Sequence, residues 1–225
     1  MNLLSVIRYI NHVCLRIFQI VVSNTKLLTY SFVYNQNGNQ FVCKGKLINS
    51  SISVRGKNNR IIISGGVFVN MTIDIRGEGH QLILDKGVSF HEGGRIVMED
   101  RNCSIRVGEN TDFVSCFFAV RDSGTNVMIG KSCMFSALTI VRTSDAHSIL
   151  NSEGKRINPG KDVYIGDHVW VGYGANILKN TDIGNNAIVG TQSVVAGISV
   201  PDGCVVAGNP ARIVKNNINW CRQRI

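Results

Sequence analysis

Residues 165–197 read IGDHVW VGYGAN ILKNTD IGNNAI VGTQSV VAG, and this stretch decides the fold. An aliphatic residue opens each block of six, in the order Ile165, Val171, Ile177, Ile183, Val189 and Val195. A short strand, a turn through roughly 120° and another short strand give three faces per coil, each with one large aliphatic side chain pointing inward. Neither two-residue alternation nor a helical period keeps this register. The repeat therefore predicts a triangular parallel β-helix.

The same frame extends upstream and predicts about seven coils. The expected inward residues are Val42, Ile48 and Val54; Ile63, Val69 and Ile75; Leu84, Phe90 and Ile96; Val107, Phe113 and Ala119; and Ile129, Phe135 and Val141. Successive coils start at residues 42, 63, 84, 107, 129, 165 and 183, so the separations are 21, 21, 23, 22, 36 and 18 residues. Every surplus over 18 falls after the third face. We therefore expect the extra residues to gather at one corner, from which the longest insertion, 142–162, projects.

Three regions follow from this frame: an N-terminal cap over 1–41, the repeat β-helix over 42–204 with the loop 142–162, and a C-terminal tail over 205–225. Apolar residues between positions 3 and 21 follow a helical stripe, which predicts an amphipathic helix over 1–22. This helix is expected to pack on the protein or on a partner subunit, with peripheral membrane contact as the alternative. Residues 27–34 are expected to form an edge strand, and residues 216–224 a short helix.

Composition narrows the class of protein. The seven cysteines are an odd set without a CxxC pair, so neither a disulfide framework nor a zinc site is indicated. A reducing compartment is expected, and the start of the chain lacks signal-peptide features, so the prediction is cytoplasmic, with the inner face of the membrane as an alternative. A net charge of +9 indicates an anionic partner. The basic residues are scattered, however, which disfavours nucleic acid.

Over about residues 42–215 the sequence resembles the hexapeptide-repeat acyltransferases. Three segments, TSDAHSI (143–149), RINPGKDVYIGDHVWVG (156–172) and VVAGNPARIV (205–214), are similar to the branch that O-acetylates bacterial capsular and lipopolysaccharide sugars, including polysialic acid O-acetyltransferases. The resemblance implies a left-handed β-helix, a homotrimer, and acetyl-CoA bound between neighbouring subunits. The handedness comes from the resemblance alone, because parallel crossovers are generally right-handed.

His147 is the candidate general base. It lies among polar neighbours in the long loop, and imidazole is the side chain whose ordinary pKa lies near neutrality. The resemblance implies that this histidine deprotonates the acceptor hydroxyl, which then attacks the thioester directly. Either Asp145 or Asp122 could orient the imidazole, and the sequence does not choose between them. No GxSxG motif surrounds Ser144 or Ser148, which disfavours a covalent serine mechanism.

Trp170 is the second candidate, because its place one residue before the inward Val171 predicts an outward aromatic ring. By resemblance it borders the active site and holds the coenzyme A arm or the acceptor sugar, and the alternative is packing in a trimer interface. The further candidates for coenzyme A binding are turn glycines and basic residues of the later coils, namely Gly172, Gly174, Gly190, Lys179, Arg212 and Lys215. For each of these, an ordinary turn or a solvated surface charge is the alternative.

Zinc carbonic anhydrases also use this repeat and need three converging histidines. The five histidines here, His12, His80, His91, His147 and His168, are poorly placed in the coil frame to share a metal, so no metal is expected. The sequence therefore predicts an acetyl-CoA-dependent O-acetyltransferase acting on a sugar hydroxyl of a bacterial surface polysaccharide. The alternatives are acetylation of a small molecule, such as a sugar nucleotide or an antibiotic, and a non-catalytic scaffold.

Overall fold

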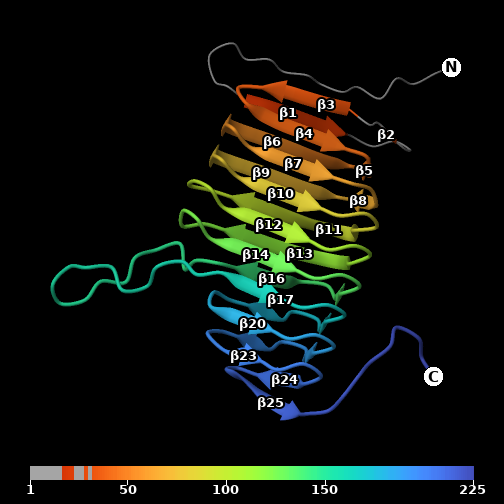
Figure 1. Ribbon diagram of the computed structural model, residues 1–225, viewed down its shortest axis with the longest axis vertical. Helices are drawn as coiled ribbons and strands as arrows, with labels where there is room; N and C mark the ends of the chain where they lie inside the picture. The colour runs from red at the N-terminus through yellow and green to blue at the C-terminus, as the bar shows by residue number, and fades with distance from the viewer. Residues whose placement is uncertain (1–16, 23–27, 30–31) are drawn as a thin grey trace.

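The structure is a computed structural model that describes residues 17–22, 28–29 and 32–225, with side chains from residue 37 onward. The described chain is a parallel β-solenoid whose coils stack along one axis (Figure 1). Seven complete coils are followed by two faces of an eighth. The all-β solenoid and the number of coils predicted from the repeat are thus confirmed.

Each coil contributes a strand to each of three faces. Face one is a nine-stranded sheet of β3 (Phe32–Gln36), β4 (Asn39–Cys43), β7 (Arg60–Ile63), β10 (Gln81–Leu84), β12 (Ser104–Val107), β14 (Asn126–Ile129), β17 (Val163–Ile165), β20 (Thr181–Ile183) and β23 (Ser199–Val200). All neighbours in it are parallel except β3, which pairs antiparallel with β4. Face one therefore begins the coil in every layer.

Face two continues each coil, through β5 (Lys46–Ile48), β8 (Val67–Val69), the first parts of β11 (Ser89–Met98) and β13 (Asp112–Val120), β15 (Met134–Phe135), β18 (Trp170–Val171), β21 (Ile188–Val189) and β24 (Val205–Gly208). Two antiparallel strands pair with its ends. These are β2 (Leu28–Thr29) on β5 and β25 (Ala211–Lys215) on β24.

Face three closes each coil, through β6 (Ser50–Lys57), β9 (Met71–Glu78), the second parts of β11 and β13, β16 (Thr139–Arg142), β19 (Asn176–Ile177) and β22 (Val194–Val195). We call the turn from face one to face two corner A, that from two to three corner B, and that from three to one corner C. The upstream surplus residues lie at the end of face three, as expected. They also lengthen its strands, because β9, β11 and β13 continue into segments predicted to be loops.

The interior contains a column of aromatic rings on face two. Phe68, Phe90, Phe113 and Phe135 are each fully buried, and successive coils bring their rings to centroid distances of 5.8, 4.4 and 4.6 Å. Stacked phenylalanines add to the free energy of burial of their area. The column locks the register of four successive coils.

This column corrects the predicted register of the first coils. Cys43, Leu47 and Phe68 occupy the interior positions that were assigned to Val42, Ile48 and Val69, and Phe118 occupies that of Ala119. The aliphatic residue beside each one made the period ambiguous by one position, and a one-residue shift reverses the face of a strand. Val54 and Ile75, the predicted inward residues of face three, are buried. The residues that align with Ile96 are, however, Ile52 and Ile73, two positions earlier in each strand.

A ladder of buried polar side chains runs along corner C. Asn39 Oδ1 accepts from the Asn59 amide, Asn59 Oδ1 accepts from the His80 amide, and His80 Nδ1 accepts from the Cys103 amide, at 2.9, 2.9 and 3.2 Å. Thr125 Oγ1 continues the ladder to Thr143 Oγ1 at 3.0 Å. In the first three of these bonds, a side chain of one coil thus accepts a backbone amide of the next coil. The ladder ends where the long insertion begins.

Strand pairing replaces the described part of the predicted N-terminal helix. Residues 17–22 form β1 (Ile17–Val22), antiparallel to β6, whereas the rest of the predicted helix over 1–22 lies outside the described residues. Because IFQIVV is rich in β-branched residues and β6 offers an open edge, a strand is favoured there. The edge strand predicted over 27–34 corresponds to β2 and the start of β3, while residues 27, 30 and 31 are not described.

The C-terminal helix predicted over 216–224 is wrong, because this segment is irregular throughout. Asn217 has a positive φ of 56°, which interrupts any helix, and Ile218 donates its amide to the Gly203 carbonyl. The Trp220 indole stacks on His168 at 4.2 Å and donates to the His168 carbonyl at 2.8 Å. These contacts fix the tail against corner A instead of allowing a free helix. No helix of the described residues is long and apolar enough to cross a membrane.

We expect the buried His80 to make the fold sensitive to acid. Burial lowers the pKa of His80 below its ordinary value of 6.5. Below that value an unfolded chain takes up a proton that the folded chain does not, so the free energy of unfolding falls by up to about 1.4 kcal/mol per pH unit and proton. Urea unfolding at pH 7.5 and 5.5 measures this loss, which should be smaller in His80→Gln. The exposed His91→Gln is the control and should keep it; an equal loss in both variants would contradict the assignment.

Candidate active site

The insertion at corner C folds as a projecting hairpin between β16 and β17 (Figure 1). Leu150 and Arg156 form an antiparallel bridge, Ile157 donates its amide to the Ile149 carbonyl at 2.9 Å, and Asn151 donates to the Lys155 carbonyl. These bonds pair the outgoing and returning arms. The hairpin therefore has its own backbone hydrogen bonds and can hold a side chain in a fixed place.

Buried hydroxyls fix the start of the hairpin. Thr143 Oγ1 donates to the Arg121 carbonyl at 3.0 Å, and Ser144, also buried, hydrogen-bonds the Asp122 carboxylate. Ser144 Oγ also accepts from the amide of Ala146, which has a φ of 66°. The chain thus turns sharply one residue before His147.

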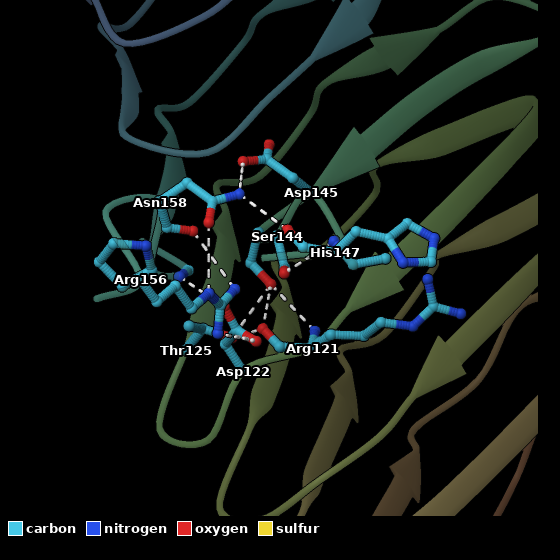
Figure 2. Close-up of polar contacts among 12 residues, drawn as sticks. Arg121, Asp122, Thr125, Ser144, Asp145, His147, Arg156 and Asn158 are labelled. Atoms are coloured by element: carbon cyan, nitrogen blue, oxygen red, sulfur yellow. Dashed lines mark hydrogen bonds and ion pairs between the residues drawn. The ribbon is translucent and has the colours of Figure 1, made fainter. Parts of the chain in front are cut away.

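Asn158 joins the two arms beside His147. Its Nδ2 donates to the His147 carbonyl at 2.8 Å and to Asp145 Oδ2 at 2.7 Å, while its Oδ1 accepts from the Ile149 amide at 2.7 Å. The side chain is largely buried. One amide thereby binds the Asp145 carboxylate before the candidate base and fixes the backbone at and after it (Figure 2).

Asp122 fixes the returning arm. Its carboxylate accepts from both terminal nitrogens of Arg156, at 3.2 and 2.6 Å, and from the Gly160 amide at 2.6 Å. Partial burial raises the pKa of Asp122, but the hydrogen bonds from Arg156 and Gly160 outweigh burial and hold it below its ordinary value. Asp122 is therefore an ionised anchor for the hairpin.

Asp145 is held by a different cation. Lys179 Nζ donates to Asp145 Oδ2 at 2.6 Å and to the carbonyls of Asn158 and Pro159 at 3.1 and 3.2 Å. The hydrogen bond from Lys179, with a further one from Asn158, holds the pKa of Asp145 below its ordinary value. Lys179 thus ties the later coils to the hairpin.

The His147 side chain is exposed, and its imidazole forms no hydrogen bond within the described residues. In Figure 2 the side chain of Asp145 points toward Asn158, whereas the side chains of His147 and Arg121 extend together in the opposite direction. Neither of the two carboxylates considered for the orienting role contacts the imidazole. The structure positions His147 through its backbone and leaves both ring nitrogens accessible.

The other predicted site residues lie at other corners. Trp170 begins β18 just after corner A, is 37% exposed, and lies 5.9 Å from the Trp220 ring. Gly172, Gly174 and Gly190 lie at corner B, where an added Cβ on Gly172 would come within 2.7 Å of the Thr191 amide nitrogen of the next coil. Close stacking of the coils thus accounts for this glycine. One chain does not bring these residues together with His147.

Arg212 and Lys215 lie on β25, the last strand, and both are exposed. A shallow depression of about 770 Å³ lies on the outer surface of face one, between Met128, Tyr164 and Asp182, and does not include His147. Among the residues that the structure describes, no group of three His, Cys, Asp or Glu side chains is arranged to hold a metal ion.

Sequence reasoning missed the residues that hold the hairpin. Asn158 and Arg156 lie in RINPG, where an Asn-Pro-Gly turn inside the insertion was the available signal. Trp220 was assigned to a helix, although it packs beside Trp170. Arg121 follows a buried strand of another coil, and no local pattern connects it with His147.

Comparison with known proteins agrees with this architecture. Residues 162–197 match the family model described as bacterial transferase hexapeptide (six repeats). A polysialic acid O-acetyltransferase of Escherichia coli O1:K1 is 46% identical over 202 residues, covering 86% of this chain and 63% of that protein. The Neisseria meningitidis polysialic acid O-acetyltransferase is 42% identical over 123 residues, covering 54% of this chain and 57% of that protein. The chain thus spans less than two thirds of the length of these two curated relatives.

Two solved structures share the fold over most of both chains. The polySia-specific acetyltransferase NeuO is 32% identical with a TM-score of 0.67, covering 83% of this chain and 86% of that one. The polysialic acid O-acetyltransferase OatWY is 30% identical with a TM-score of 0.75, covering 84% and 90%. The solenoid is thus that of the bacterial hexapeptide-repeat transferases. The chain belongs to this family, in the group that contains the polysialic acid O-acetyltransferases.

Loss of the Asn158 amide should loosen the segment around His147. In Asn158→Ala we expect backbone amides of residues 144–150 to exchange with solvent about tenfold faster, since about 1.4 kcal/mol of hydrogen bonding is lost. Hydrogen exchange followed by mass spectrometry measures this. Asn151→Ala, at the tip of the same hairpin, is the control and should change only the tip. Unchanged protection of 144–150 in Asn158→Ala would show that other contacts hold this segment.

Proposed function

We propose that this protein transfers the acetyl group of acetyl-CoA to a hydroxyl of a sialic acid residue in a bacterial surface polysaccharide. The 46% identity to a polysialic acid O-acetyltransferase over 86% of the chain carries this proposal. The exposed His147 on a fixed hairpin supplies a suitable base, and the net charge of +9 suits an anionic polymer. Use of acetyl-CoA would place the reaction in the cytoplasm.

In the proposed reaction His147 removes the proton of the acceptor hydroxyl as its oxygen attacks the thioester carbonyl. The new C–O bond forms, the C–S bond breaks, and the proton on the imidazole passes to the leaving thiolate. The acceptor gains one acetyl ester, coenzyme A leaves as a thiol, and the imidazole returns to its starting form. Asp145 and Asp122 act as positioning residues in this scheme, because Asn158 and Arg156 connect them to the hairpin.

We propose further that the active form is a homotrimer with each site between two chains. His147 lies beyond corner C, whereas Trp170 lies after corner A, so a neighbouring chain is needed to bring the two side chains together. Trp170 and the turn glycines at corner B would then hold the coenzyme A arm. Arg212 and Lys215 are exposed and available for its phosphates.

Removal of the base should abolish transfer without unfolding the protein. His147→Gln is expected to lower kcat for acetyl transfer to polysialic acid by about 10²–10⁴-fold, the usual contribution of general base catalysis, with an unchanged Tm. Release of the free thiol, coupled to acetyl ester formation, measures kcat. His91→Gln is the control on face two and should retain full activity. Full activity in His147→Gln would refute the catalytic assignment.

Mixing two inactive variants tests whether the site is shared. If His147→Ala and Trp170→Ala are each inactive, unfolding and refolding an equal mixture should restore about a quarter of wild-type activity, the share of interfaces that combine both intact residues. A mixture as inactive as its components would instead place both residues in the site of a single chain. Refolded wild-type protein gives the reference rate.

A further inference from the structure

The outer surface of face three is rich in arginine. Five arginines and two carboxylates lie on its strands and at their ends, namely Arg55, Arg76, Arg95, Arg121 and Arg142 with Asp74 and Glu99. Asp74 binds Arg55 at 3.4 Å and Arg76 at 2.5 Å, while Glu99 binds Arg76 and Arg121. The two carboxylates thus neutralise only part of the positive charge of this surface.

Arg95 and Arg142 have no carboxylate partner among the described residues. Both guanidinium groups lie over the ring of Phe117, with their central carbons 6.0 and 5.5 Å from its centroid. An aromatic face attracts cations but carries no net charge. Two like charges are therefore held around one ring without a counter-ion from the chain.

Arg142 is also partly desolvated. Its Nε is buried and has no hydrogen-bond partner, although the side chain as a whole is half-buried and reaches the surface. A guanidinium that has lost part of its water shell interacts strongly with an anion, since less water must be displaced when the anion binds. Arg142 is thereby prepared for a ligand of negative charge.

This arginine pair lies next to the hairpin. Arg142 is the last residue of β16, and the segment that carries His147 begins with the next residue. Arg121, on the adjacent coil of the same face, extends in the same direction as His147 (Figure 2). A ligand that covers Phe117 would therefore extend toward the candidate base along face three.

We propose that Arg95, Phe117 and Arg142 form an acceptor subsite that binds a carboxylate-bearing sugar of an anionic glycan. The guanidinium groups pair with the sugar carboxylate in the planar geometry that arginine favours, and the Phe117 ring holds both groups in place. A neutral sugar would leave both guanidinium groups unpaired, so this subsite selects acidic acceptors. The inference rests on the proposed acetyl transfer and names the residues that would select its acidic acceptor.

The double variant Arg95→Gln/Arg142→Gln tests the subsite through steady-state kinetics. We expect KM for polysialic acid to rise at least about tenfold and its dependence on salt to weaken, while kcat and KM for acetyl-CoA stay within about twofold. The double lysine variant should restore only part of the affinity, because lysine cannot pair in the same planar way. Arg60→Gln/Arg106→Gln on face one removes the same charge and is the matched control.

An unchanged KM for polysialic acid would overturn the proposal. So would a rise in KM for acetyl-CoA instead, which would assign the two arginines to the coenzyme phosphates. Should the wild-type protein acetylate no sialic acid polymer, the proposed function would fail, and direct binding still decides the subsite. In fluorescence anisotropy with labelled oligosialic acid at low salt, the wild type should bind and the Arg95→Gln/Arg142→Gln protein should not; equal binding by both would refute the subsite.

Discussion

The turns of the first five coils at corner C depend on buried hydrogen bonds between neighbouring layers. Asn39, Asn59, His80, Thr125 and Thr143 supply side chains that bond across the turn from one layer to the next. A buried backbone amide without a partner costs free energy, so each rung specifies the geometry of the next. Together with the phenylalanine column on face two, this ladder determines where corner C lies in the fifth coil.

The candidate site is a consequence of that placement. The ladder ends at Thr143, and the residues after it form a hairpin held by Asp122, Asn158 and Lys179. All three contacts act on the backbone or on charges beside His147, and none acts on its ring. The hairpin thus holds the main chain around His147 and leaves the imidazole open, which is the arrangement that the proposed base would need.

The six-residue period was sufficient to predict the solenoid, its seven coils and the corner that carries the insertion. It failed where neighbouring aliphatic residues compete for the same interior position, as Leu47 and Ile48 do, because hydropathy does not separate them and the pairing of Leu47 with Phe68 sets the register. The helical stripe failed at Ile17–Val22 because the β-branched residues there and the open edge of β6 both favour a strand. At the C-terminus, packing of Trp220 on His168 fixes an irregular tail in place of the predicted helix.

Within the site, the sequence predicted an exposed His147 but not its neighbours. Asp145 lies two residues before His147 and points away from it, whereas Arg121 comes from the preceding coil and extends in the same direction as His147. Separations of a full coil or more leave no local pattern in a single sequence. The positions of these side chains follow from the register between strands of neighbouring coils. That register is set by the stacking of the coils and leaves no mark in a local stretch of sequence.

The most direct test follows a ¹³C-labelled acetyl group from acetyl-CoA in the presence of the purified protein and polysialic acid. We predict that the label appears by NMR as an ester on sialic acid residues, with an equal amount of free coenzyme A thiol. A folded protein that leaves the polymer unlabelled, or that labels a neutral glycan equally well, would contradict it.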